Sequence, residues 1–214
     1  MRRASLLLIF LAARTFAADL QYQIPDGWVD LVDPSVDTSR FPANPVHEAR
    51  SGRYRIYAVD PDNLSEQGAN ALVNVLEIDQ RGPVTHEVMR RAMQEAWDKS
   101  RTLGYRMNIL DTRVMKLGEV DIGVVDYTLG NAAGTLHLLQ YFIPGEKKSA
   151  VVTYGCRPDL FDQYRPIFEA SAKATKGAYS YGFDWGRALK RTLITSAIGA
   201  VIATVFAAIV LRFR

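Results

Sequence analysis

The sequence has very little cysteine: among its 214 residues there is only Cys156. A single cysteine cannot form an internal disulfide, so packing alone must hold the fold together. Short motifs of common active sites are lacking as well. There is no glycine-rich phosphate loop, no Gly-x-Ser-x-Gly and no His-Glu-x-x-His.

Histidine is also scarce. His47, His86 and His137 are scattered along the chain without ligand spacing, which argues against a zinc site. We therefore predict no metal site, no cofactor and no catalytic residue from sequence motifs.

Cys156 is the one candidate nucleophile. It follows a predicted strand and precedes a predicted helix, whose dipole could lower the pKa of the thiol. His137 lies in another predicted strand, and nothing in the sequence places it beside Cys156. A lone cysteine at a strand end is more often buried and inert. A thiol-dependent hydrolase using Cys156 is thus an alternative hypothesis.

An excess of positive charge is absent from the body of the chain. The formal net charge is +3, but eight of the 26 basic residues lie near the two ends. Residues 18–184 contain 18 basic and 23 acidic residues, a net charge of −5. A nucleic-acid partner is therefore not expected.

What the sequence does have is one long apolar stretch, residues 193–211, without a charged side chain. At 1.5 Å per residue, a helix of about 19 residues spans roughly 28 Å, close to the hydrocarbon thickness of a bilayer. We predict a transmembrane helix over residues 192–212. A buried core helix is the weaker alternative, because such helices seldom lack a polar face over this length.

Aromatic and basic residues flank this stretch, as is typical of a membrane interface. The predicted interface residues are Tyr179, Tyr181, Trp185, Arg187, Arg191 and Arg212. Within the stretch, Gly199, Ala203 and Ala207 are spaced four apart and form a stripe of small residues. Such a stripe lets two helices approach closely, so a homodimer through the span is a further hypothesis.

Residues 1–17 have the pattern of a secretory signal peptide. Arg2 and Arg3 precede the short apolar run 6–13, and small residues lead up to Ala17. An uncleaved N-terminal anchor is the alternative. The basic residues before the span favour a cytoplasmic body when taken alone. We give the signal peptide more weight and expect a single-pass protein of the bacterial inner membrane, with its soluble domain on the periplasmic side.

Residues 18–175 are predicted to form one domain, joined to the span by a juxtamembrane tether over residues 176–191. The domain opens with a turn at Pro25–Gly27, and residues 32–51 are expected to be loop. Strands are predicted over residues 53–59, 71–79, 106–115, 120–129, 135–143 and 149–155, and helices over 83–103 and 158–174. Pro144 and Gly145 predict a type II turn.

The late strands are joined by short connections, which force neighbours to run antiparallel. In the strand over residues 135–143, Leu138 and Phe142 point one way, while Leu139 and Tyr141 point the other. A strand that is apolar on both sides is covered on both sides. We therefore predict an α+β fold, an α/β/α sandwich with a central antiparallel sheet, followed by the C-terminal transmembrane helix.

The pattern of these elements resembles the PsbP-like family. The likeness covers roughly residues 21–174 and includes Ile24-Pro25-Asp26-Gly27-Trp28 at the start, Tyr141-Phe142 before the Pro-Gly turn, Val151-Val152-Thr153-Tyr154, and Phe161 to Phe168. The family includes extrinsic subunits of photosystem II, bacterial DcrB-like envelope proteins and a nuclear Ran-binding release factor. The resemblance implies a binding or assembly module without catalysis of its own, and it transfers no functional residue.

Many bacterial members of that family are lipoproteins. Here no cysteine follows the signal region, so the transmembrane helix would replace a lipid anchor. The main hypothesis is a non-enzymatic, membrane-anchored, exported domain that binds or assembles an envelope protein partner. A small-ligand or metal-binding carrier with a cleft between sheet and helix is a second alternative.

Overall fold

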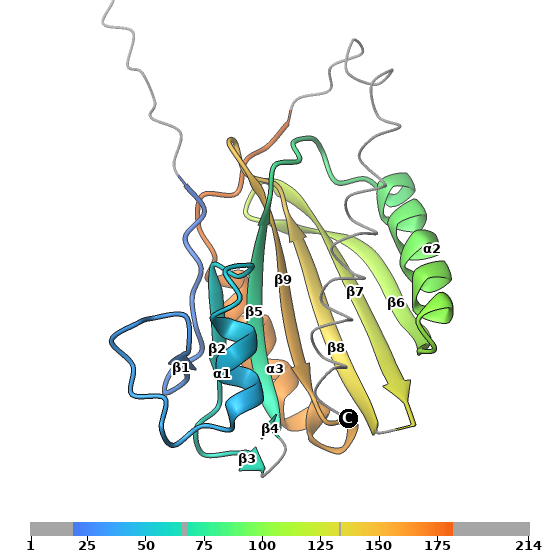
Figure 1. The fold of residues 1–214 in the computed structure, drawn as a ribbon. Coiled ribbons are helices and arrows are strands. Elements are labelled where there is room, and N and C mark those ends of the chain that lie inside the picture. Colours follow the sequence, from blue (N-terminus) through green and yellow to red (C-terminus); the bar gives the residue numbers. More distant parts are fainter. Residues whose placement is uncertain (1–18, 66–67, 133, 182–214) are drawn as a thin grey trace, which may run out of the picture.

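The computed structural model describes residues 19–65, 68–132 and 134–181, which form a mixed α+β fold around one large antiparallel sheet (Figure 1). Its seven strands lie in the order β1-β2-β5-β9-β8-β7-β6. Their bounds along that order are Val29–Asp30, Ile56–Val59, Ala71–Ile78, Ser149–Cys156, Gly134–Ile143, Val120–Asn131 and Arg106–Leu117. A small hairpin pairs β3 (Leu64–Ser65) with β4 (Gly68–Ala69). The predicted antiparallel sheet is confirmed.

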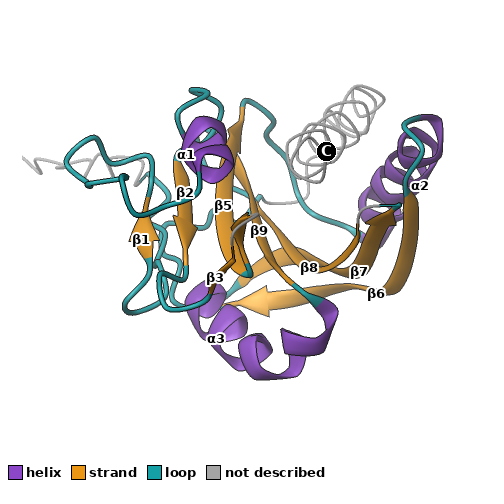
Figure 2. Cartoon of the chain, turned by 60° about the horizontal axis from the view of Figure 1, so that its bottom comes forward, coloured by secondary structure: helices purple, strands orange, loops and turns teal. Residues whose placement is uncertain are grey.

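The described helices are α1 (Ala43–Ala49), α2 (His86–Thr102) and α3 (Phe161–Lys173), the last preceded by a 3-10 turn over Pro158–Leu160. Figure 2 shows α3 on one face of the sheet and α1 and α2 on the other. The helix predicted over residues 83–103 begins later, because Thr85 is its N-cap and its hydroxyl accepts from the backbone N–H of Val88 at 3.2 Å.

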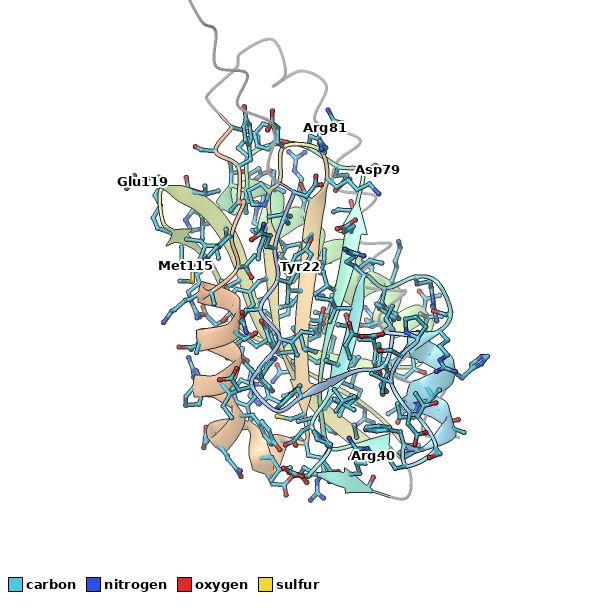
Figure 3. The ribbon with its side chains drawn as sticks, turned by 90° about the vertical axis from the view of Figure 1, so that its left-hand side faces the viewer. Tyr22, Arg40, Asp79, Arg81, Met115 and Glu119 are labelled. Carbon is cyan, nitrogen blue, oxygen red and sulfur yellow. The ribbon has the colours of Figure 1, made fainter. Side chains whose placement is uncertain are left out.

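The face beneath α3 holds the largest single cluster of the core. Phe161, Tyr164, Phe168 and Ala172 of α3 pack on alternate residues of the central strands, among them Tyr154. The N-terminal segment 19–28 lies over the same face, and Figure 3 shows its Tyr22 in front of the strands and Met115 beside α3. A backbone bridge from Gln21 to Lys176 ties this segment to the chain after α3.

The opposite face of the sheet is covered by α2 near one edge and by α1 near the other. Under α2, the residues Val88, Met89, Ala92, Met93 and Ala96 pack on the other alternate set of strand residues, including Leu138 and Phe142. Under α1, a smaller cluster contains Leu31, Phe41, Ala49, Tyr57 and Leu72. Leu138 and Phe142 thus face away from Leu139 and Tyr141, which confirms the predicted two-sided strand.

Helix α1 corrects the expectation that residues 32–51 are loop. The three prolines of this segment favoured a loop, but Pro45 lies in the first turn of a seven-residue helix. Proline is tolerated there because a first-turn N–H has no intrahelical acceptor. The apolar side chains of Phe41 and Ala49 then complete the cluster beneath it.

No helix among the described residues is long and apolar enough to cross a membrane. The predicted signal peptide (1–17) and transmembrane helix (192–212) lie outside the described residues, as does the tether from residue 182 onward.

Candidate functional site

The last described residues run along the turn between β8 and β9. The backbone N–H of Tyr179 donates to the carbonyl of Pro144 at 2.8 Å, and the Tyr181 hydroxyl donates to the carbonyl of Gly145 at 2.6 Å. The two tyrosine rings lie edge to face, 4.9 Å apart. The predicted tether therefore begins at one end of the sheet.

Gly145 is required there for close packing and not for the predicted type II turn. Its φ is not positive, whereas that turn needs a positive φ at this position. A Cβ on Gly145 would lie 2.1 Å from the carbonyl oxygen of Lys148. The glycine also pairs with Ala178 in an isolated bridge, so it lets the segment after α3 lie against the turn.

A polar hollow of about 410 Å³ lies beside this turn. Four of its six charged lining residues form ion pairs, Lys147 with Asp19 at 3.1 Å and Lys148 with Glu77 at 3.8 Å. These pairs are largely solvent-exposed, and such pairs contribute only about 0–1 kcal/mol. The hollow has balanced charge, so it offers no strong field to an ionic ligand.

The structure brings Cys156, His137 and Asp126 together on the face beneath α3. Cys156 ends β9 and lies directly opposite His137 of β8 in the ladder. The imidazole Nε2 of His137 lies 2.6 Å from Oδ1 of Asp126 on β7, and the imidazole ring stacks on Phe161. The β8–β9 register thus places His137 beside Cys156, which the sequence alone did not indicate.

This arrangement has the residue types of a thiol hydrolase but not its chemistry. Burial raises the pKa of the Cys156 thiol to about 12, and the nearby Asp159 carboxylate adds to the shift. No hydrogen bond joins this thiol to the imidazole in the described part of the chain. The nucleophile of such enzymes is the thiolate. The net shift of this pKa is upward, so the geometry does not support a nucleophilic Cys156.

A second polar cluster joins the β3–β4 region to α3. The Tyr164 hydroxyl donates to Asp60 and accepts from the side-chain amide of Asn63 at 2.8 Å. Asn70 in turn donates to Asn63 at 2.9 Å. Burial raises the pKa of Tyr164 to about 12, and its bond to Asp60 adds to the shift. The cluster holds a loop against α3 and keeps the phenol neutral.

A polar row crosses the other face and was not predicted from the sequence. Asn74 on β5 lies opposite Thr153 on β9, which lies opposite Gln140 on β8. All three are buried, and the Gln140 amide donates to the Thr153 hydroxyl at 2.8 Å. The side-chain carbonyls of Asn74 and Gln140 have no partner among the described residues. A polar residue in the middle of an apolar run, in each of the three strands, was the signal in the sequence.

Of the predicted interface residues, Tyr179 and Tyr181 lie at the β8–β9 turn. The others, Trp185, Arg187, Arg191 and Arg212, lie outside the described residues, as do the helix-packing residues Gly199, Ala203 and Ala207. Within the described ranges, no group of three or more His, Cys, Asp or Glu side chains could hold a metal ion.

No family model matches the sequence, and no curated protein matches it. The structure is similar to that of the cyanobacterial PsbP (CyanoP) from Synechocystis sp. PCC 6803, with a TM-score of 0.51 and 11% sequence identity over 75% of this chain and 86% of that one. The fold is PsbP-like. At this identity the likeness concerns the fold alone, and it confirms the resemblance predicted from the sequence.

Two further structures have lower TM-scores and add no argument. PA94 from Pseudomonas aeruginosa has a TM-score of 0.40 and 12% identity, over 72% of this chain and 83% of that one. LpqN from Mycobacterium tuberculosis, which is involved in cell envelope biogenesis, has a TM-score of 0.32 and 13% identity, over 73% of this chain and 82% of that one.

Proposed function

We propose that this chain is a non-enzymatic binding or assembly module of the bacterial envelope, exported and anchored in the inner membrane by residues 192–212. The observation that carries the proposal is the uncharged apolar stretch 193–211, which follows a folded PsbP-like body closely in the chain. Its length suits a single span. The domain would act on the periplasmic side on a protein partner.

The position of residues 178–181 supports this arrangement. Residues 178–181 lie at the β8–β9 turn, and eleven further residues lead to residue 192. Eleven residues reach at most about 40 Å when extended. A tether that runs directly to the span would place the β8–β9 end of the sheet near the membrane, and the β3–β4 hairpin, at the other end in Figure 1, would point away from it.

The state of Cys156 supports a binding role over the hydrolase alternative. A buried thiol whose pKa is about 12 is protonated at neutral pH, so it cannot attack a substrate as thiolate. The PsbP-like resemblance also implies binding or assembly.

Alkaline carbonate extraction of membranes tests the anchor. We expect the full-length protein to stay in the membrane pellet, and the double variant Ile202→Arg, Val205→Arg to be released. Each arginine at the centre of a span costs about 3 kcal/mol. The matched control is Ile167→Arg, Ala170→Arg, which puts the same charge on the exposed side of α3 and should stay in the pellet. Release of the unchanged protein would refute the anchor.

Protease added to spheroplasts tests the orientation. We expect the body to be digested from outside in intact spheroplasts, because the domain is placed on the periplasmic side. Protection of the body until the membrane is lysed would place it in the cytoplasm and refute export.

A further inference from the structure

The two edges of the sheet are very different. On one side the sheet ends at β1, which has two residues, and on the other at β6, which has twelve. No strand among the described residues pairs with the outer side of β6. An edge of this length presents a row of backbone N–H and C=O groups to which another extended chain can add.

The two halves of β6 differ in turn. Its second half, after the bulge at Leu110, carries Arg113 and Lys116, which discourage pairing between like edges. Its first half exposes Ile109 and Leu110, with exposed fractions of 36% and 50%. Together with Leu103 at the end of α2, these are three of the five exposed large apolar side chains in the described part of the chain.

A groove of about 610 Å³ lies between α2 and β6, next to this apolar half. Its apolar lining comes from Met93 and Trp97 of α2 and Ile109 of β6. This volume is in the range of sites that take a bound side chain or small ligand, roughly 300–1,000 Å³. A strand added at the edge of β6 could place an apolar side chain in the groove.

Charge distinguishes this surface from the rest of the body. Residues 86–117, which contain α2 and β6, have seven basic and four acidic residues, whereas the rest of residues 18–184 has eleven basic and nineteen acidic ones. Arg101 lies over the Trp97 ring at 4.7 Å. Arg101 and Arg106 have no acidic partner in the described ranges. A partner segment that binds here should therefore be acidic.

We propose that the β6 edge and the α2–β6 groove bind an extended acidic segment of a partner protein. The segment adds a strand to residues 106–110 of β6, places one apolar side chain in the groove between Trp97 and Ile109, and directs its carboxylates toward Arg101 and Arg106. The proposal rests on the binding role proposed above and names its surface and the chemistry of its partner.

Site-specific photocross-linking in living cells tests the surface first. A benzophenone side chain replaces Leu110 in the full-length protein, and the matched control replaces Ile167, an exposed apolar residue of α3. We expect a cross-link from position 110, mapped by mass spectrometry to an acidic, extended segment of another protein, and none from position 167. A cross-link from 110 to a second copy, or to a helical or basic segment, would overturn the proposal.

The two failures are distinguishable. Cross-links to a protein partner from position 167 but not from 110 would refute this surface and leave the binding role standing. Cross-links from neither position would count against both.

Binding of a synthetic peptide with the mapped sequence then tests the chemistry. On the full-length protein in detergent, we expect Arg101→Glu with Arg106→Glu to weaken binding about tenfold or more, and added salt to weaken it in the unchanged protein. The matched control is Arg165→Glu with Lys173→Glu on α3, which makes the same change in charge on exposed positions away from the groove and should bind as the unchanged protein does. Equal affinity in all variants would overturn the proposal.

Discussion

The two faces of the sheet are packed with different kinds of side chain. Beneath α3 the core is aromatic: the Phe168 ring lies 5.1 Å from Tyr154, 5.7 Å from Tyr164 and 6.2 Å from Trp28, measured between ring centroids. Beneath α2 the core contains the aromatic rings of Tyr127 and Phe142, but it is mainly aliphatic and includes the three methionines Met89, Met93 and Met107. Ring pairs prefer specific geometries, whereas methionine adapts to irregular space.

We infer from this difference that the packing beneath α3 is rigid and that the packing beneath α2 can adapt. The aromatic face also holds the hydrogen-bonded Tyr164 cluster and the N-terminal segment, so many contacts specify one packing. The methionine face lies beside the α2–β6 groove, where we infer partner binding. A helix that packs through flexible side chains can shift slightly when a partner strand adds at its edge.

The largest effect is expected from Phe168→Ala. Phe168 is completely buried at the centre of the aromatic cluster, and truncation of a buried phenylalanine costs about 3–5 kcal/mol. Urea denaturation monitored by circular dichroism measures the loss. The neighbouring exposed Ile167→Ala is the control and should change stability by less than about 0.5 kcal/mol. A small loss at Phe168 would remove the claim that this face is the rigid one.

Met89 tests the other face. Its side chain is completely buried, and Met89→Ala should cost about 2–5 kcal/mol, toward the lower end if α2 settles onto the sheet. Met89→Leu keeps the volume and should cost less than about 1.5 kcal/mol. The Met89 side chain packs directly on the backbone of Gly123, because a Cβ there would lie 2.3 Å from the Met89 sulfur. If urea denaturation showed Met89→Leu to be as costly as Met89→Ala, the adaptable face would be an incorrect description.

The N-cap of α2 gives a smaller effect. Thr85→Ala removes the hydroxyl that accepts from the backbone N–H of Val88 and should lower the free energy of unfolding, measured in urea, by about 1 kcal/mol. Thr102→Ala, at the exposed end of the same helix, is the matched control and should change it by less than about 0.5 kcal/mol. Equal losses for both variants would show that the cap does not fix the start of α2.

Most elements of the sheet were predictable from the sequence because their patterns are local. Apolar runs on both sides of short turns give the antiparallel strands from residue 106 to 156, and the helical spacing of Met89, Ala92 and Met93 gives α2. The pairing of β5 with β9 was not predicted. It joins strands more than seventy residues apart, and both are largely apolar, so no local pattern selects the partner.

The environment of His137 and Cys156 was also not predictable, because it depends on contacts between residues that are distant in the sequence. His137 and Cys156 are brought together only by the β8–β9 register, which places the end of one strand beside the start of the other. The raised pKa of Cys156 follows from burial under α3, which a helix-dipole argument from sequence does not include. The short helix α1 was missed because three prolines outweighed the few apolar residues around it.

The smallest predicted effect is the loss of stability at alkaline pH that the buried Cys156 thiol causes beneath α3. Burial raises the pKa of Cys156 to about 12, whereas an unfolded cysteine titrates at about 8.5. The unfolded protein therefore loses the thiol proton at a lower pH than the folded protein does. The free energy of unfolding is unaffected by this thiol below the unfolded pKa, and it falls as the pH rises toward the folded pKa. Raising the pH from 7.5 to 9 should lower the free energy of unfolding by about 0.8 kcal/mol through this thiol.

Cys156→Ala isolates this contribution, because alanine does not titrate and the buried tyrosines, whose pKa values are also raised, remain in both proteins. We expect urea denaturation to show a steeper loss between pH 7.5 and 9 in the unchanged protein than in the variant. Unfolded tyrosines titrate at about 10, so this window precedes most of their effect. Parallel pH profiles would mean that the thiol is not held neutral beneath α3, and the case against a reactive Cys156 would lose its main support.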